Sequence, residues 1–128
     1  MKPVSATLTP QELEIMKIVW RLEKATVREV YEVLLERRRI AYTTVMTMMK
    51  ILEKKKRLVR RLEDKVFVYA PAVPGKQVIR EMVREFVDRV FNGAAEPLVA
   101  HLVEDRRLSE RDLRAIASMI RNSEGSKR

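Results

Sequence analysis

The strongest constraint on the fold is the order of signals in the first 70 residues, where three helix patterns precede two short strands. The first helix is predicted to begin at Thr9–Glu12, where Thr-Pro-Gln-Glu combines an N-cap, a proline at the first helical position and a capping-box glutamate. Apolar residues at helical spacing extend it to about Leu22. A second capping box, Thr26–Glu29, opens a helix that we expect to end near Arg37.

The third helix is predicted from about Tyr42 to Lys55, and its two faces differ in chemistry. One stripe is apolar and consists of Val45, Met48, Met49 and Leu52. The opposite stripe has hydroxyls near the start and lysines near the end, at Thr43, Thr47, Lys50 and Lys54. Short hydroxyls and long cations on one helix face suit contacts with DNA bases and phosphates.

A β-hairpin is predicted directly after the third helix. Leu58–Leu62 and Val66–Ala70 are rich in β-forming residues, and the polar residues 63–65 between them form a turn. Three helices followed by a hairpin is the element order of a winged helix-turn-helix, in which the third helix enters the major groove and the hairpin, or wing, flanks it. We therefore expect a mainly α fold with a small β-hairpin wing, followed by a helical dimerisation domain. The DNA-binding residues predicted on it are Tyr42, Thr43, Thr44, Met46, Thr47, Lys50, Lys54, Arg60, Arg61 and Lys65.

The charge distribution supports a polyanionic partner for the first part of the chain. The net charge of the 128 residues is +9. Residues 1–70 hold 16 Lys/Arg against 9 Asp/Glu, so they contribute +7, whereas residues 71–128 contribute +2. A basic excess of this size favours nucleic acid first and an anionic membrane second.

The C-terminal part is predicted to be helical and to form a homodimer. Helices are expected over about 76–91, 96–104 and from about 109, with a polar, frayed tail from Ser123. We divide the chain into a DNA-binding domain, 1–73, and a dimerisation domain, 74–128. Three short helices bury little apolar surface on their own, so their wide apolar stripes indicate packing against a second copy. The predicted dimerisation residues are Ile79, Met82, Val83, Phe86, Val87, Val90, Leu98, Leu102, Leu113 and Ile116.

Several classes of protein are disfavoured by what the sequence lacks. The chain has no cysteine and one histidine, His101, which leaves little material for a metal site or a catalytic triad. It has three glycines and no glycine-rich phosphate loop, so neither an enzyme nor a cofactor is expected. No apolar run reaches the roughly 18 residues that span a membrane, and residues 1–9 lack the apolar core of a signal peptide. We therefore expect a cytoplasmic protein without membrane insertion.

Five segments give the sequence a resemblance to a known family: Leu8–Trp20, Thr26–Val30, Ala41–Lys55, Val66–Pro71 and Pro97–Asp105. Over Leu8 to about Ile120 the chain resembles the penicillinase-repressor and copper-transport-repressor family of bacterial winged-helix regulators, which also includes the methicillin-resistance regulators. The resemblance implies a homodimeric repressor on an inverted-repeat operator in double-stranded DNA. It implies recognition by Tyr42, Thr43, Met46, Thr47 and Lys50, with a wing at 60–65.

The resemblance also implies a mechanism of release, and here the chain departs from the family. One branch is cleaved by a membrane sensor-protease between an asparagine and a phenylalanine, and the matching positions hold His101 and Leu102. Another branch binds metal at a C-terminal cysteine pair, which this chain lacks. A third departure is Lys56, which stands where the family often has a helix-ending glycine.

Two other functions are weighed against the repressor. A basic helical protein-interaction module would bind an acidic partner or membrane without sequence-specific DNA binding, but would have no need of Arg60 and Arg61 on a wing. RNA binding is a weaker variant, because aromatic residues make up 5% and single-strand readers use aromatic stacking.

Overall fold

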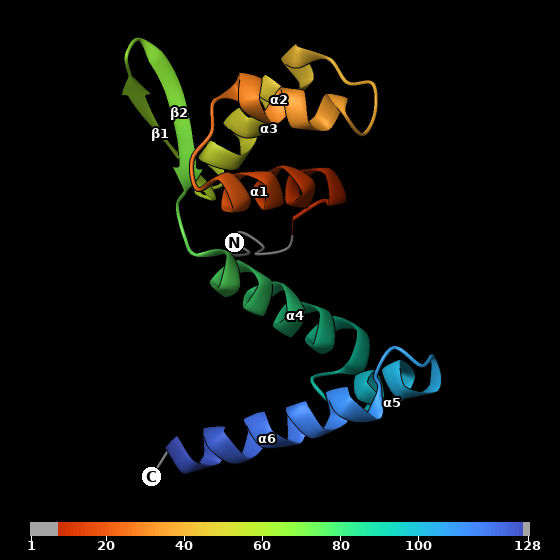
Figure 1. The fold of residues 1–128 in the computed structure, drawn as a ribbon. Helices are drawn as coiled ribbons and strands as arrows, with labels where there is room; N and C mark the ends of the chain where they lie inside the picture. The colour runs from red at the N-terminus through yellow and green to blue at the C-terminus, as the bar shows by residue number, and fades with distance from the viewer. Residues whose placement is uncertain (1–7, 127–128) are drawn as a thin grey trace. The chain divides into compact units, whose positions relative to one another are not determined.

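The computed structural model describes residues 8–126, which form six helices and one two-stranded antiparallel sheet (Figure 1). The elements are α1 (Pro10–Leu22), α2 (Val27–Leu35), α3 (Tyr42–Lys54), β1 (Leu58–Glu63), β2 (Val66–Pro71), α4 (Gly75–Phe91), α5 (Glu96–Glu104) and α6 (Glu110–Ser126). Two compact units divide inside α4, the first ending at Glu85 and the second beginning at Phe86.

Capping boxes start the first two helices, as predicted. In α1 the Thr9 hydroxyl accepts from the Glu12 N–H at 3.1 Å, and the Glu12 carboxylate accepts from the Thr9 N–H at 2.9 Å. Thr26 and Glu29 form the same pair of bonds at the start of α2. These bonds satisfy backbone donors that have no partner within the helix. By contrast, the N-cap residue of α3 is Ala41, which makes no side-chain capping bond.

The core of the first unit is shared by all of its elements. Fully buried apolar side chains come from α1, α2, α3, the hairpin and the start of α4: Ile15, Met16, Val19, Val30, Leu34, Val45, Met49, Leu52, Leu58, Tyr69 and Val78. Gly75 touches the Trp20 ring so closely that a Cβ there would lie 2.9 Å from Cδ2. The first turns of α4 therefore belong to this core, and Met82 packs half-buried against it.

The hairpin is fixed by its register and by a tight turn. Arg60 faces Tyr69, and Leu62 faces Phe67. The two turn residues, Asp64 and Lys65, have φ of +48° and +68°, the sign that a type I′ turn requires at both positions. Tyr69 of β2 also pairs with Ala25: the Tyr69 N–H donates to the Ala25 carbonyl, and the Ala25 N–H donates to the Tyr69 carbonyl, both at 2.8 Å. These two bonds anchor β2 to the segment before α2.

Helix α3 ends in a Schellman motif with a lysine in place of glycine. Lys56 has φ +64°, the left-handed region. The Arg57 N–H donates to the Leu52 carbonyl at 2.8 Å, and the Lys56 N–H donates to the Glu53 carbonyl at 2.9 Å. The departure at Lys56 therefore changes the residue without changing the way in which the helix ends.

The second unit contains the end of α4, α5 and α6. Within it, the Phe91 ring packs edge-on to Phe86 at 5.9 Å between centroids and lies 5.9 Å from the His101 ring. Helix α6 continues to Ser126, so the tail expected from Ser123 is helical in its first residues. No helix in the described part of the chain is long and apolar enough to cross a membrane.

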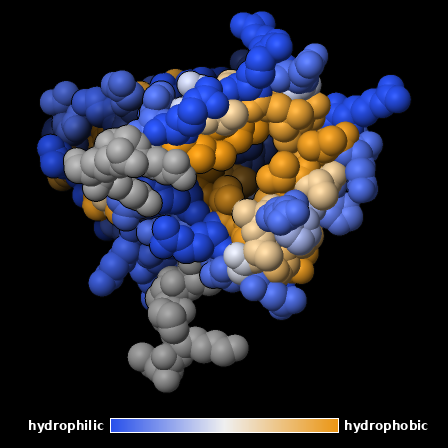
Figure 2. Space-filling model, turned by 90° about the horizontal axis from the view of Figure 1, so that it is seen from below, coloured by the Kyte–Doolittle hydropathy of each residue, from blue (hydrophilic) through white to orange (hydrophobic). Residues whose placement is uncertain are grey.

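Apolar residues also reach the surface, as the space-filling view in Figure 2 shows. In the second unit the exposed apolar side chains are Phe86, Val90, Val99, Val103, Leu113, Met119 and Ile120.

Candidate nucleic-acid interface

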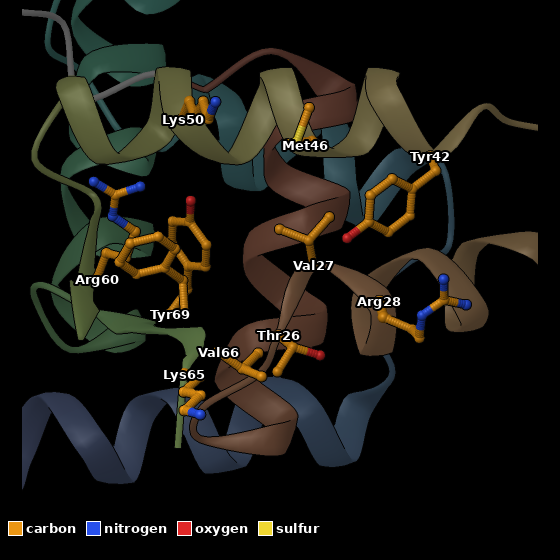
Figure 3. Close-up of a pocket in the computed structure, with 11 residues that line it drawn as sticks. Thr26, Val27, Arg28, Tyr42, Met46, Lys50, Arg60, Lys65, Val66 and Tyr69 are labelled. Carbon is orange, nitrogen blue, oxygen red and sulfur yellow. The ribbon is translucent and has the colours of Figure 1, made fainter. Parts of the chain in front are cut away.

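An open cleft of about 580 Å³ lies between α3, the hairpin and the start of α2 (Figure 3). Eleven described residues line it: Thr26, Val27, Arg28, Tyr42, Met46, Lys50, Arg60, Lys65, Val66, Phe67 and Tyr69. Four of these carry a positive charge and none is acidic. The cleft thus has an apolar floor and cationic walls, which is a surface that attracts a polyanion.

The two stripes of α3 lie as predicted. Val45, Met49 and Leu52 are fully buried, so the helix is held by its apolar face. The polar stripe and its neighbours are exposed to solvent: Tyr42, Thr43, Thr44, Thr47, Lys50 and Lys54. Met46 is half-buried and reaches the cleft.

The hairpin presents its two arginines differently. Arg60 lines the cleft, whereas Arg61, one residue further along the strand, is exposed and does not. Five of the predicted residues, Tyr42, Met46, Lys50, Arg60 and Lys65, thus come together in the cleft. The other five, Thr43, Thr44, Thr47, Lys54 and Arg61, are exposed outside its lining.

Arg60 is held on several sides. Its Nε lies 3.5 Å from the Glu53 carboxylate of α3, and its guanidinium carbon lies 4.0 Å from the centre of the Phe67 ring. Tyr69, its partner across the hairpin, is almost fully buried beside it. Burial raises the pKa of the Tyr69 hydroxyl above its ordinary value.

Arg28 is a cleft residue that the sequence interpretation missed. Its guanidinium carbon lies 5.5 Å from the centre of the Tyr42 ring, and the Tyr42 ring meets Tyr31 edge-on at 5.4 Å. A signal was present in the sequence, because Arg28 falls in the first turn of α2, where the helix dipole disfavours a cation. Within α2 this cost is offset in part by Glu32, one turn later, whose carboxylate lies 4.0 Å from the Arg28 guanidinium.

The run of arginines after α2 has a structural partner. Arg37 and Arg38 both pair with Glu14 of α1, at 3.2 Å for Arg37. The hydrogen bond from Arg38 is the main reason that the pKa of Glu14 lies below its usual value. Near the tip of the wing, Glu63 pairs with Lys24 at 3.2 Å, so part of its negative charge is balanced.

The predicted dimerisation residues differ in exposure. Ile79, Val83, Phe86, Val90 and Leu113 are exposed, while Met82, Val87, Leu98, Leu102 and Ile116 are half-buried. The candidate cleavage position joins an exposed His101 to a half-buried Leu102 within α5.

Comparisons with known proteins support the same reading of the fold. Residues 8–122 match the model of the penicillinase repressor family. The penicillinase repressor of Bacillus licheniformis is 26% identical over 121 residues, 94% of either chain. The transcriptional regulator BlaI of Mycobacterium tuberculosis is 34% identical over 112 residues, 84% of this chain and 81% of that protein.

A solved structure adds the arrangement in space. The solution structure of the monomeric form of Bacillus licheniformis BlaI in complex with the blaP half-operator has a TM-score of 0.50 and 32% identity. The match covers 59% of this chain and 92% of that chain. The prediction of a mainly α, winged helix-turn-helix fold is confirmed.

Proposed function

This chain belongs to the penicillinase repressor family and is a transcriptional repressor that binds operator DNA, and we propose that it binds an inverted repeat as a homodimer. Membership of this family argues against the two other functions considered for the chain, that of an enzyme and that of a protein-interaction module. Operator binding would make the cytoplasm its place of action. The proposal assigns residues 1–73 to DNA binding and residues 74–128 to dimerisation. Val78, at the start of α4, is part of the hydrophobic core of the first unit.

The observation that carries the proposal is the cleft between α3 and the wing. When a helix lies in the major groove and a hairpin flanks it, the strand that borders the groove passes between them. The cations Arg28, Lys50, Arg60 and Lys65 line that passage. They supply the phosphate contacts that fix the protein's position on the duplex.

Base contacts fall to the exposed stripe of α3. The hydroxyls of Thr43 and Thr47 reach base edges or phosphates, and Met46 meets a thymine methyl. Lys50 serves guanine or phosphate, while Thr44, Lys54 and Arg61 contact the backbone beyond the cleft. Because α3 is anchored by fully buried residues, these side chains are presented on a rigid element.

Dimerisation places two recognition helices on the two half-sites of the operator. Apolar side chains exposed on α4, α5 and α6 would be covered by a second copy. The repressor would be released from the operator when a membrane sensor-protease cleaves the second unit. The bond between His101 and Leu102 lies inside α5, so cleavage there requires α5 to unfold locally.

The test is fluorescence anisotropy with DNA from upstream of this protein's own gene and with a scrambled duplex, over a salt series. A dimer making about 6–10 phosphate contacts should lose roughly 10³–10⁵ in affinity between 50 and 200 mM salt. We expect the native sequence to bind far more tightly than the scrambled one. Equal and weak binding of both duplexes would contradict recognition of that site.

A further inference from the structure

Among the four cations of the cleft, Arg60 has the most extensive set of fixed contacts. Glu53 meets its Nε, Phe67 stacks beneath its guanidinium, and Tyr69 is fully buried beside it. Lys50 and Lys65 line the same cleft, yet within the described part of the chain neither has an ion-pair partner. Among the described residues, the cleft thus combines two lysines that have no ion-pair partner with two arginines that have one, Arg28 with Glu32 and Arg60 with Glu53.

The three partners of Arg60 come from different parts of the unit. Glu53 lies in the last turn of α3, whereas Phe67 and Tyr69 belong to β2. Tyr69 is itself anchored by its pair of backbone hydrogen bonds to Ala25. Arg60 is therefore tied to the recognition helix and to the wing at the same time, and its position depends on how these two elements sit together.

The pair with Glu53 leaves part of the guanidinium available. The Glu53 carboxylate approaches the guanidinium most closely at Nε, at 3.5 Å, and not at the two terminal amino groups. Those groups form the planar fork that binds phosphate oxygens in pairs. About a third of the Arg60 side chain and about a third of the Glu53 side chain are exposed, which is enough for a phosphate to approach Arg60.

We propose that Glu53 is a positioning residue for operator recognition: it holds Arg60 against Phe67, so that Arg60 meets the backbone in one fixed geometry. The inference rests on the proposed function. A phosphate contact carries no base information by itself, but a rigid one fits only a backbone that follows a particular path. A loosened Arg60 would follow the backbone of any duplex, and discrimination between operator and other DNA would fall.

The test compares the ratio of operator to scrambled-DNA affinity in the wild type and in Glu53→Gln. Ordering one long side chain on binding changes affinity by about 2- to 10-fold, and we expect the ratio to fall by that factor for each half-site. Loss of a negative charge should raise the affinity for scrambled DNA. The matched control is Glu81→Gln, which breaks an acid–arginine pair of 3.7 Å in the same unit, outside the cleft lining. It should leave the ratio unchanged.

Two further variants separate positioning from a general effect of charge. In an Arg60→Ala background, Glu53→Gln should cause no further fall of the ratio. Phe67→Leu, which removes the ring beneath the guanidinium, should lower the ratio as Glu53→Gln does. The role of Glu53 would be overturned if Glu53→Gln lowered the affinity ratio equally with and without Arg60. It would also be overturned if the wild type preferred its operator and Glu53→Gln did not lower the ratio. A wild type without any preference would overturn the proposed function itself.

Discussion

At the scale of single residues, two helices are followed by a charged residue in the left-handed backbone conformation, which glycine adopts with less strain. Lys56 and Arg106 both occupy the left-handed position after a helix, at φ +64° and +57°. In each case the next residue donates to the carbonyl five positions back, at 2.8 Å. A side chain in this conformation costs roughly 1 kcal/mol relative to glycine.

Lys56→Gly should therefore stabilise the protein by about 0.5–1 kcal/mol, measured by urea unfolding. The control is Lys54→Gly, which makes the same change inside α3 and should destabilise by about 1 kcal/mol. If both variants lost stability, the strain at Lys56 would be relieved by contacts of its side chain.

A second residue-scale feature is the buried carboxylate of Glu12. Burial raises its pKa, but the hydrogen bonds from Lys55 and Thr9 together outweigh that effect, so the pKa lies below the ordinary value of 4.5. Lys55 lies 2.8 Å from the carboxylate and joins the end of α3 to the start of α1.

The pKa of Glu12 predicts a loss of stability in acid. Since the folded-state pKa is the lower one, the stabilisation is complete above about pH 4.5 and is lost as pH falls through the folded value. Glu14, whose pKa is also lowered, should add to this loss. Unfolding in urea from pH 7 to pH 3 should show a shallower decline for Glu12→Gln, which starts from a lower stability at pH 7. An unchanged slope would contradict the contribution of Glu12.

At the scale of elements, the wing shows a conflict between stability and DNA contact. Its type I′ turn favours Asn-Gly, and the chain has Asp64-Lys65 there. Lys65 takes a strained conformation and lines the cleft. The lysine is thus unfavourable for the turn and favourable for binding a phosphate.

Lys65→Gly should raise the thermal midpoint while weakening DNA binding, and should reduce the salt slope by about 1 for each protomer. Lys65→Ala removes the same charge without relieving the turn, so it should weaken binding with no gain in stability. Equal midpoints for the two variants would show that the turn stores no strain at this residue.

The recognition helix makes a separate prediction at the same scale. Thr47 and Lys50 are exposed while the opposite face of α3 is buried. Thr47→Ala and Lys50→Ala should weaken operator binding and leave the helical circular dichroism unchanged, with about 1–3 kcal/mol lost where a base contact is removed. A loss of helicity in either variant would place that residue on the structural face instead.

At the scale of the whole molecule, the second unit exposes more apolar surface than a monomer needs. Phe86 is 40% exposed and Val90 is 49% exposed, on a helix that begins in the core of the first unit. The proposed homodimer would cover this surface. A change on the exposed face of α4 that weakens the dimer should therefore also lower operator affinity.

Phe86→Glu should dissociate the dimer and lower operator affinity, because an unpaired charge would be buried at the interface. Gln77→Glu adds a charge at an exposed polar position of the same helix and should leave the dimer intact. Analytical ultracentrifugation distinguishes the two, and unchanged sedimentation of Phe86→Glu would contradict the dimer interface.

The helices and strands could be predicted from local patterns in the sequence. Capping boxes at Thr9 and Thr26 work over three residues, helical stripes repeat over three or four, and strand composition marks the hairpin, so each signal lies within its own segment. The order of these elements sufficed for the winged-helix prediction, and the exposed stripe of α3 followed from periodicity.

The contacts between side chains of different elements could not be predicted in this way, because they depend on how the elements pack. The register of the hairpin places Arg60 across from Tyr69, and the packing of the wing on α3 brings Glu53 to Arg60. The packing of α2 brings Arg28 to Tyr42, and the packing of α1 brings Glu14 to the arginines after α2. These contacts join residues that belong to different helices and strands, or to the segment after α2. They depend on the angles between packed elements, and local periodicity does not encode those angles.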